Sequence, residues 1–218
     1  AFVAEWLVRR LNAGGVLLGH DTRFGRGGRG DLALLLRLGK LHGFDVCSSE
    51  VVEAGGAPVS STRIREAIRR GDLDAARGML GRRVSLLGTV VRGAGIGRTL
   101  GFPTANLDLH HEVRPPEGVY ATLAVIGGRV YPSATNIGRP PTLRPGGPAY
   151  RSQTATVETH VLDFAGDLYG QDIEVRFVER LRDEESFATA SPLAERIGRD
   201  VVEARRRLAA LKEAPETP

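Results

Sequence analysis

Apolar and polar residues in the first third of the chain alternate between the helical period and the strand pattern. Apolar positions recur every three or four residues in four segments, which predicts helices over residues 2–11, 32–41, 63–70 and 72–80. Between the first two helices lies a short apolar run, residues 16–18, which we expect to be a buried strand. Residues 44–52, with Val51 and Val52, are typical of another strand. This alternation indicates a piece of a parallel α/β sheet, in a part that closes at Gly81.

Beyond Gly81 the pattern changes to short alternating runs rich in Val, Thr and Tyr and separated by Gly, Pro and Asn. These runs predict strands at residues 84–92, 119–126, 129–134, 154–164 and 172–181. Gly127 and Gly128 stand between two of them and form a two-residue hairpin signal. Five or six short strands without helical crossovers favour an antiparallel barrel or a sandwich.

The last predicted element is a long amphipathic helix. Ser191 and Pro192 suit its N-cap and its first helical position. Apolar residues then recur on one face at Leu193, Ile197, Val201, Ala204, Leu208 and Leu211. We expect this face to pack on the barrel as core rather than bind a partner, and residues 213–218 to form a frayed tail.

Composition is that of an ordinary folded protein. Of 218 residues, 41% are hydrophobic and 26% charged, which excludes disordered and collagen-like chains. No apolar run reaches the ~18 residues of a membrane helix, so we expect no membrane association. The lone cysteine, Cys47, cannot form an internal disulfide, which fits a reducing cytoplasm. The chain begins at Ala1 without a methionine or a signal pattern, and we expect it to be a piece of a longer protein.

Net charge is +4, and neither part of the chain carries a strong excess of basic residues, so nucleic acid is not an expected partner. Residues 25–30, Gly-Arg-Gly-Gly-Arg-Gly, match the letters of a dinucleotide-binding fingerprint. In a true fingerprint the glycines begin at the strand end, whereas residues 21–24 intervene here. The same letters are similar to an RGG element that binds RNA. One such repeat without aromatic residues is more typical of a mobile surface loop.

Residues 93–106 contain the densest cluster of candidate chemistry. Gly93, Gly95 and Gly97 expose backbone N–H groups with little side-chain obstruction, as a phosphate cradle requires. Arg98 would add a positive charge. Thr104 and Asn106 offer a hydroxyl and an amide oxygen to Mg²⁺. The alternative is a glycine-rich hairpin with polar turn residues, and the residues alone leave both interpretations open.

Glu158 lies inside an otherwise β-branched strand. Alternation puts Glu158 and His160 on one face and Val157, Thr159 and Val161 on the other. A carboxylate at this position is either a solvated outward residue or a general base at the barrel mouth.

A second candidate site lies at the start of the helix predicted over residues 63–70. Ser61, Thr62 and Arg65 stand near its N-terminus, where free N–H groups and the helix dipole favour an anion. The alternative is a simple helix cap followed by a basic helical face.

With these residues the chain resembles the bacterial bifunctional riboflavin kinase/FAD synthetase family, and the resemblance spans essentially the whole chain. The kinase motifs are Gly97-Arg98-x-x-Gly101-Phe102-Pro103-Thr104-Ala105-Asn106, Gly118-Val119-Tyr120, Asn136-Ile137-Gly138 with Pro141-Thr142, Val157-Glu158-x-His160-x-x-Asp163-Phe164 and Gly166-Asp167-Leu168-Tyr169-Gly170. The nucleotidyltransferase motifs are Leu18-Gly19-His20-Asp21-Thr22-Arg23-Phe24-Gly25 and Val59-Ser60-Ser61-Thr62-Arg63-Ile64-Arg65. Their order and spacing make coincidence very improbable.

The resemblance implies an architecture of two modules. Residues 1–80 would be the second part of a Rossmann-like α/β FMN adenylyltransferase module. Residues 81–214 would be a riboflavin kinase module, a six-stranded antiparallel β-barrel with a C-terminal helix, followed by a tail at residues 215–218.

The resemblance also implies an activity, the transfer of the γ-phosphoryl group of ATP to riboflavin to give FMN. Glu158 would accept or orient the hydroxyl proton, and Gly93, Gly95, Gly97 and Arg98 would hold the phosphates. Thr104 and Asn106 would serve Mg²⁺ and the nucleotide. Arg182 and Phe187 would shape the flavin pocket, and Ser61, Thr62 and Arg65 would contact ATP in adenylyl transfer to FMN.

One departure from the family changes these expectations. The family's adenylyltransferase module opens with a glycine-rich strand and loop bearing His-x-Gly-His, and this sequence contains no matching segment. We therefore expect FMN synthesis but no FAD synthesis from this chain. The competing functions are a flavin or nucleotide binder without catalysis and an RNA-binding protein that uses its Arg-rich loop.

Overall fold

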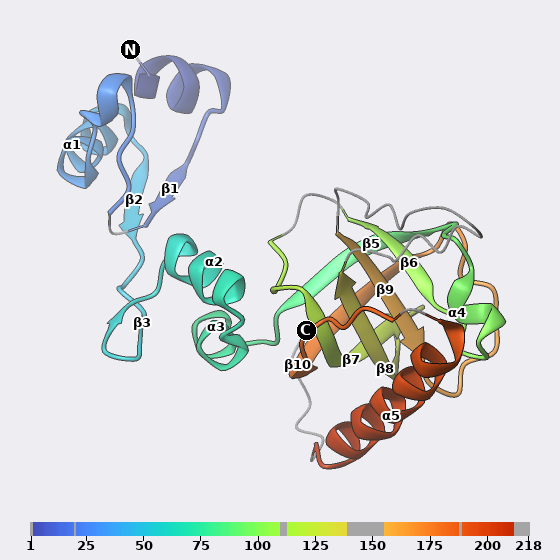
Figure 1. Cartoon of the computed structure of the whole chain (residues 1–218). Helices are drawn as coiled ribbons and strands as arrows, with labels where there is room; N and C mark the ends of the chain where they lie inside the picture. Colours follow the sequence, from blue (N-terminus) through green and yellow to red (C-terminus); the bar gives the residue numbers. More distant parts are fainter. Residues whose placement is uncertain (1, 20, 110–112, 139–154, 188, 212–218) are drawn as a thin grey trace. The chain divides into compact units, whose positions relative to one another are not determined.

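The chain forms two compact units, Ala1–Val59 and Ser60–Pro218 (Figure 1). A computed structural model describes residues 2–19, 21–109, 113–138, 155–187 and 189–211. The division falls between Val59 and Ser60, so the two helices that precede Gly81 belong to the second unit. The boundary between two modules expected at residues 80 and 81 stays a prediction.

The first unit is built on two parallel strands. Its helices are the π-helix η1 (Val3–Arg10), the short 3-10 helix η2 (Arg26–Gly28) and the α-helix α1 (Leu32–His42). Its strands are β1 (Gly15–Leu18), β2 (Asp45–Ser48), β3 (Glu53–Ala54) and β4 (Ala57–Pro58). β1 and β2 pair in parallel, with Val16 opposite Val46. Leu35 of α1 and Phe44 are buried in a small core against these strands and Val3 of η1. The parallel pair joined through α1 confirms the α/β character of this part.

Local signals fix the ends of α1. The Asp31 side chain accepts a hydrogen bond of 2.9 Å from the Leu34 N–H, which satisfies one of the free donors of the first turn. Gly43 ends the helix in the left-handed conformation, with φ 78°, where a residue without Cβ carries no steric penalty.

Two expectations for the strands of this unit are wrong. β1 is not buried: Leu17 is 72% exposed, because the packed core covers only the face that carries Val16 and Leu18. β2 ends at Ser48, and Val51 and Val52 lie exposed beyond it. Val52 instead accepts a hydrogen bond of 2.8 Å from Val59 at the open end of the β3–β4 hairpin.

The loop at residues 25–30 is closed upon itself. Phe24 and Gly30 form an isolated antiparallel bridge, with N–O distances of 3.0 and 2.8 Å in the two directions. The turn is therefore complete before Asp31 caps α1, and β1 ended much earlier, at Leu18. This arrangement lacks the direct passage from strand through glycines to helix that defines a dinucleotide fingerprint.

The second unit is a closed barrel preceded by two helices and followed by one (Figure 1). Its elements are α2 (Ser61–Arg70), α3 (Leu73–Leu80), β5 (Ser85–Val91), α4 (Ile96–Thr99), β6 (Ala105–Leu109), β7 (Gly118–Ile126), β8 (Arg129–Gly138), β9 (Thr156–Val161), β10 (Asp172–Arg182) and α5 (Ala190–Ala209). The strands pair antiparallel in the closed order β10-β5-β6-β9-β8-β7. The expected six-stranded antiparallel barrel is confirmed. β7 and β8 meet through Gly127 and Gly128, at φ 55° and 78°, as the hairpin signal predicted.

The barrel interior holds an apolar core crossed by a chain of hydroxyl groups. The rings of Tyr120 and Phe177 pack edge to face, with centroids 5.2 Å apart. Four fully buried hydroxyl residues on β7, β8 and β9 are joined by hydrogen bonds of 2.8, 2.8 and 3.0 Å, in the order Ser133, Thr122, Thr135, Thr159. Each buried hydroxyl group needs a hydrogen-bond partner. A shift in the register of β7, β8 or β9 would break these hydrogen bonds, so they stabilise the observed register.

Helix α5 packs on the outside of the barrel through its C-terminal half. Ala204 and Leu208 are buried against Ala121, Ala134 and Leu162, as the apolar face predicted. The predicted N-cap is wrong: the helix starts at Ala190 after Thr189, and both Ser191 and Pro192 lie in its first turn. Proline is accepted there because the first N–H groups of a helix have no partner inside it. The expected tail, residues 213–218, lies outside the described residues.

Candidate active site

A cavity of about 160 Å³ opens on the outer face of the barrel. The polar residues that line it from the barrel side include Thr104, Asn106, Asn136, Glu158, His160 and Arg182. Side chains alternate along strands, so Asn106, Asn136 and Glu158 face outward, while their neighbours Ile137 and Val157 fill the core. The barrel pattern therefore brings polar groups from three strands to one surface.

Apolar residues of α5 and the segment before it form the opposite wall. Leu193, Ile197 and Val201 line the cavity from the N-terminal half of the helix, and Phe187 lines it from the preceding segment. The face of α5 that was expected to be all core thus has two roles along its length. Its second half packs on the barrel, and its first half lines the cavity.

Glu158 is the central ionisable group of this cavity. On β9 it lies directly opposite Asn106 of β6 on one side and Asn136 of β8 on the other. The Thr104 hydroxyl donates a hydrogen bond of 3.4 Å to its Oε2. Burial raises the pKa of the Glu158 carboxyl above its usual range, and hydrogen bonds from Thr104 and Thr156 oppose that rise only in part. A carboxylate with a raised pKa in a cavity is suited to accept a proton.

The raised pKa of Glu158 predicts a cost in stability. The folded chain holds this proton to higher pH than the unfolded chain, so stability falls as pH rises from about 4.3 through the folded pKa. We expect Glu158→Gln to raise the melting temperature near pH 7.5, by about 2–4 °C for each kcal/mol that the substitution adds to the free energy of unfolding. Below about pH 4 the difference in melting temperature should vanish, since residue 158 is then neutral in the parent protein as well as in the variant. Melting curves at the two pH values check this, and a variant that melts lower at pH 7.5 would contradict it.

A second hollow of about 70 Å³ adjoins the first at Thr104, which lines both. Its lining includes Arg98, Pro103, Phe164, Asp167 and Tyr169. Glu158 lines the larger cavity only, and Arg98 lines the smaller one only. Thr104 thus marks the junction between the cavity that contains Glu158 and the hollow that Arg98 lines.

Two of the three predicted cradle glycines are needed for close packing. Gly93 lies directly against the side-chain amide of Asn106, and Gly97 lies against the Phe102 carbonyl oxygen and the Thr104 side chain. A Cβ at either position would collide with these atoms. Gly95 is exposed, with φ 70°, at the start of the short helix α4. The glycines therefore set the positions of Asn106 and Thr104, and phosphate binding by their N–H groups stays a prediction.

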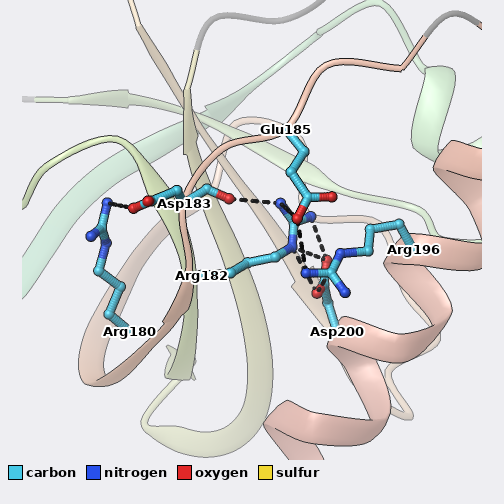
Figure 2. A network of polar contacts seen from close by, with 6 residues as sticks. All are labelled: Arg180, Arg182, Asp183, Glu185, Arg196 and Asp200. Carbon is cyan, nitrogen blue, oxygen red and sulfur yellow. Dashed lines mark hydrogen bonds and ion pairs between the residues drawn. The ribbon is translucent and has the colours of Figure 1, made fainter.

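Arg182 lines the cavity, and its guanidinium is held by an ion pair with Asp200 of α5 (Figure 2). Arg182 Nη2 lies 2.6 Å from Asp200 Oδ2, and its Nε lies 2.9 Å from Oδ1. Arg182 Nη1 donates to the Asp183 carbonyl at 2.8 Å, and Arg196 of α5 pairs with Glu185 at 2.9 Å. The network ties the end of β10 and the segment after it to α5. A contact of Arg182 with flavin stays a prediction.

Breaking this buried pair should destabilise the fold. Only 13% of the Arg182 side chain and 10% of the Asp200 side chain are exposed, so Asp200→Ala would leave a buried cation with only the longer 3.9 Å contact to Glu185. We expect a loss of about 3–5 kcal/mol in the free energy of unfolding, measured by urea denaturation. The matched control is Glu195→Ala in the same helix, which breaks the exposed pair with Arg199 and should cost far less. Equal losses in the two variants would contradict this account of the network.

The other predicted site lies away from the cavity lining. Ser61, Thr62 and Arg65 are at the exposed start of α2, and none of them lines either hollow. The Ser60 hydroxyl accepts a hydrogen bond of 3.3 Å from the Arg63 N–H, as expected for an N-cap. Anion binding by this terminus stays a prediction.

Several cavity residues were not among the predicted site residues. Asn136, Glu184 and Glu185 line the cavity, and so does Asp200. Of these, Asn136 stood in a quoted motif and could have been found there. Within the same motifs, His20, Pro141 and Thr142 lie outside the described residues.

The described residues place limits on metal and membrane binding. Among them no group of three His, Cys, Asp or Glu side chains is arranged to hold a metal ion. In the same described part, no helix has the length and apolar character to cross a membrane.

The chain is similar in sequence to two protein families and to curated bacterial enzymes. A family model for FAD synthetase matches residues 1–63, and one for riboflavin kinase matches residues 80–208. The bifunctional riboflavin kinase/FMN adenylyltransferase of Escherichia coli K12 is 39% identical over 205 residues, which cover 94% of this chain. Its counterpart in Bacillus subtilis is 33% identical over 205 residues and 93% of this chain. The chain spans 63% of the length of both relatives.

A solved structure has the same fold. A macrolide-efflux protein from Streptococcus pneumoniae superposes with a TM-score of 0.73 at 29% identity, over 93% of this chain and 64% of that one. The match to the riboflavin kinase model includes all six barrel strands and nearly all of α5. Since this match extends over more than half of the sequence, the chain belongs to the riboflavin kinase family.

Proposed function

We propose that this chain transfers the γ-phosphoryl group of ATP to the 5′-hydroxyl of riboflavin, giving FMN and ADP. The observation that carries the proposal is the position of Glu158, a half-buried carboxyl with a raised pKa, hydrogen-bonded to Thr104 where two hollows meet. A kinase needs two substrate sites that adjoin at the reacting atoms, and this junction supplies them.

Riboflavin suits the larger cavity. Its isoalloxazine ring is uncharged, and Phe187, Leu193, Ile197 and Val201 provide an apolar wall. Its ribityl chain carries hydroxyl groups that would bind the polar groups of the barrel wall, with the terminal hydroxyl at Glu158.

The nucleotide suits the smaller hollow. Arg98 lines it with a positive charge that would attract the phosphates, and Tyr169 and Phe164 offer aromatic surface to the base. Because Thr104 lines both hollows, a nucleotide bound here would direct its terminal phosphate toward Glu158. Gly93 and Gly97 would support this arrangement by allowing Asn106 and Thr104 their positions.

Mg²⁺ fits this junction as a metal held mainly by phosphates. Thr104 and Asn106 would hold it through the hydroxyl and the amide oxygen, and Glu158 lies beside both. Mg²⁺ usually takes few protein ligands and the rest from phosphates and water, which agrees with the lack of an acidic cluster among the described residues. When bound with ATP, it neutralises charge on the transferred group.

Glu158 acts as the proton acceptor in this scheme. The 5′-oxygen forms a bond to the γ-phosphorus while the bond between that phosphorus and the β–γ bridging oxygen breaks, and ADP leaves. The hydroxyl proton passes to the Glu158 carboxylate. Positioning and charge neutralisation supply the rest of the rate enhancement, as in phosphoryl transfer generally.

The two modules are proposed to divide the chemistry between them. Residues 81–214 would carry the kinase, and residues 1–80 would be part of an FMN adenylyltransferase, with Ser61, Thr62 and Arg65 at its ATP phosphates. We propose a cytoplasmic location, which agrees with the free thiol of Cys47. Riboflavin, FMN and ATP would be the partners.

The function is tested by two incubations of the purified chain, one with riboflavin and MgATP and the other with FMN and MgATP, each followed by chromatography of the flavins. We expect FMN from the first and no FAD from the second. FAD from the second would show adenylyl transfer by this chain. No conversion of riboflavin, with flavin bound in a dialysis experiment, would replace the proposal by a binding protein without catalysis.

A further inference from the structure

A histidine on β9 anchors the segment that carries Thr104. His160 Nδ1 lies 2.8 Å from the Pro103 carbonyl oxygen. A carbonyl can only accept a hydrogen bond, so Nδ1 carries the hydrogen and donates it. The Phe102 ring packs edge to face against the His160 ring, with centroids 5.7 Å apart. His160 therefore contacts two consecutive residues just before Thr104.

This anchor lies where the backbone ladder between β6 and β9 stops. The last residue pair of the ladder joins Ala105 to Thr159, and the same register would place Thr104 opposite His160. Pro103 has no N–H group and cannot continue the ladder. Its carbonyl oxygen is satisfied by a side chain, that of His160, instead of by the backbone of the neighbouring strand.

The segment is held from its other side by Gly97. The Phe102 N–H donates a hydrogen bond of 2.8 Å to the Gly97 carbonyl, and the missing side chain of Gly97 leaves room for Thr104. Thr104 then reaches Glu158, which stands two residues before His160 on the same face of β9. Strand β9 thus carries both Glu158, which accepts the hydrogen bond from Thr104, and His160, which holds the segment just before Thr104.

We infer that His160 is a positioning residue for phosphoryl transfer: it fixes residues 102–103 so that the Thr104 hydroxyl stands between Glu158 and the nucleotide phosphates. The inference rests on the proposed kinase function and adds a residue whose effect passes through Thr104. His160 also lines the larger cavity, so a direct contact with riboflavin is the alternative that the test must separate.

Two substitutions separate the hydrogen bond from the bulk of the ring. His160→Leu removes the donor, whereas His160→Asn keeps an N–H donor at the place of Nδ1. We expect His160→Leu to lower kcat and to raise KM for MgATP, together by about 10- to 100-fold in kcat/KM, as for other residues that orient a ligand of the metal. KM for riboflavin should change by less than about twofold, and His160→Asn should recover most of the loss. His42→Leu, an exposed histidine in the other unit, is the control expected to match the parent chain.

A double-mutant cycle tests the route of the effect. If His160 acts through Thr104, adding His160→Leu to Thr104→Val should cost little beyond Thr104→Val alone. Fully additive losses would overturn the inference, and so would a riboflavin KM that rises as much as the KM for MgATP. A melting temperature of His160→Leu within a few degrees of the parent shows that loss of the fold is not the cause.

A binding measurement keeps the inference separate from the proposed function. Titration calorimetry with MgADP should give a dissociation constant about tenfold higher for His160→Leu than for the parent and for His160→Asn. If the parent chain makes no FMN, the proposed function fails. Equal MgADP affinities in the three proteins would overturn the positioning role of His160, whatever the outcome for FMN formation.

Discussion

Glu158→Gln should reduce kcat for FMN formation by about 10²–10⁴-fold, the usual contribution of a positioned general base. The substitution keeps the shape of the side chain and its ability to accept a hydrogen bond from Thr104. It removes the group that takes the proton of a primary alcohol, which is a poor nucleophile near neutral pH. KM for MgATP should therefore change little, since Glu158 lines the larger cavity and not the smaller hollow.

The pH dependence of kcat in the parent chain is a second test of the Glu158 carboxyl. Because burial raises the pKa of Glu158, kcat should fall on the acid side at a pH above the usual range of a glutamate. The control is Glu174→Gln, which changes a part-buried glutamate paired with Arg176 on β10 and outside both hollows. An equal loss of activity in the two variants, or a loss in Glu158→Gln that follows a lower melting temperature, would contradict the assignment.

Thr104→Val should have the second largest effect on catalysis, a loss of about 10- to 100-fold or more in kcat/KM for MgATP. Valine has nearly the same shape as threonine but lacks the hydroxyl that donates to Glu158 and that would serve Mg²⁺. The loss should be accompanied by a higher Mg²⁺ concentration for half-maximal rate.

Thr104→Ser is the matched control for this prediction, because it keeps the hydroxyl and removes only a methyl group. Its kcat/KM should lie within about tenfold of the parent. If serine and valine at this position lose activity equally, the methyl packing beside Gly97 matters and the hydroxyl does not.

Short-range patterns predicted most of the fold, because strands and helices with one buried face repeat their apolar residues at fixed intervals. Four of the six barrel strands and the hairpin at Gly127 and Gly128 lie close to their expected places, and the strand expected over residues 129–134 extends four residues further. β6 was missed, since it has only five residues and follows a segment rich in Gly and Pro. Leu17 was expected inside because an apolar run does not say which of its faces is covered.

The candidate site was predicted where its residues stand in recognisable motifs and missed where they meet only in space. Thr104 and Asn106 come from one motif and Glu158 from another, and each motif stood out in the sequence. Asp200 lies among ordinary helical residues, and nothing near it indicates that it pairs with Arg182 eighteen positions earlier. The buried hydroxyl groups inside the barrel were also missed. Nothing in the sequence near these threonines and the serine indicates that strand pairing brings them within hydrogen-bond distance.

A crystal structure with riboflavin and MgADP would test the central claim most directly, because the claim concerns two substrates that meet at one junction. We predict the isoalloxazine ring against Phe187 and the apolar wall of α5, with the ribityl 5′-hydroxyl within about 3.2 Å of the Glu158 carboxylate. The ADP phosphates should lie beside Arg98 and Thr104 in the smaller hollow. Riboflavin bound elsewhere, or in this cavity with its 5′-hydroxyl directed away from Glu158 while MgADP is present, would contradict the account.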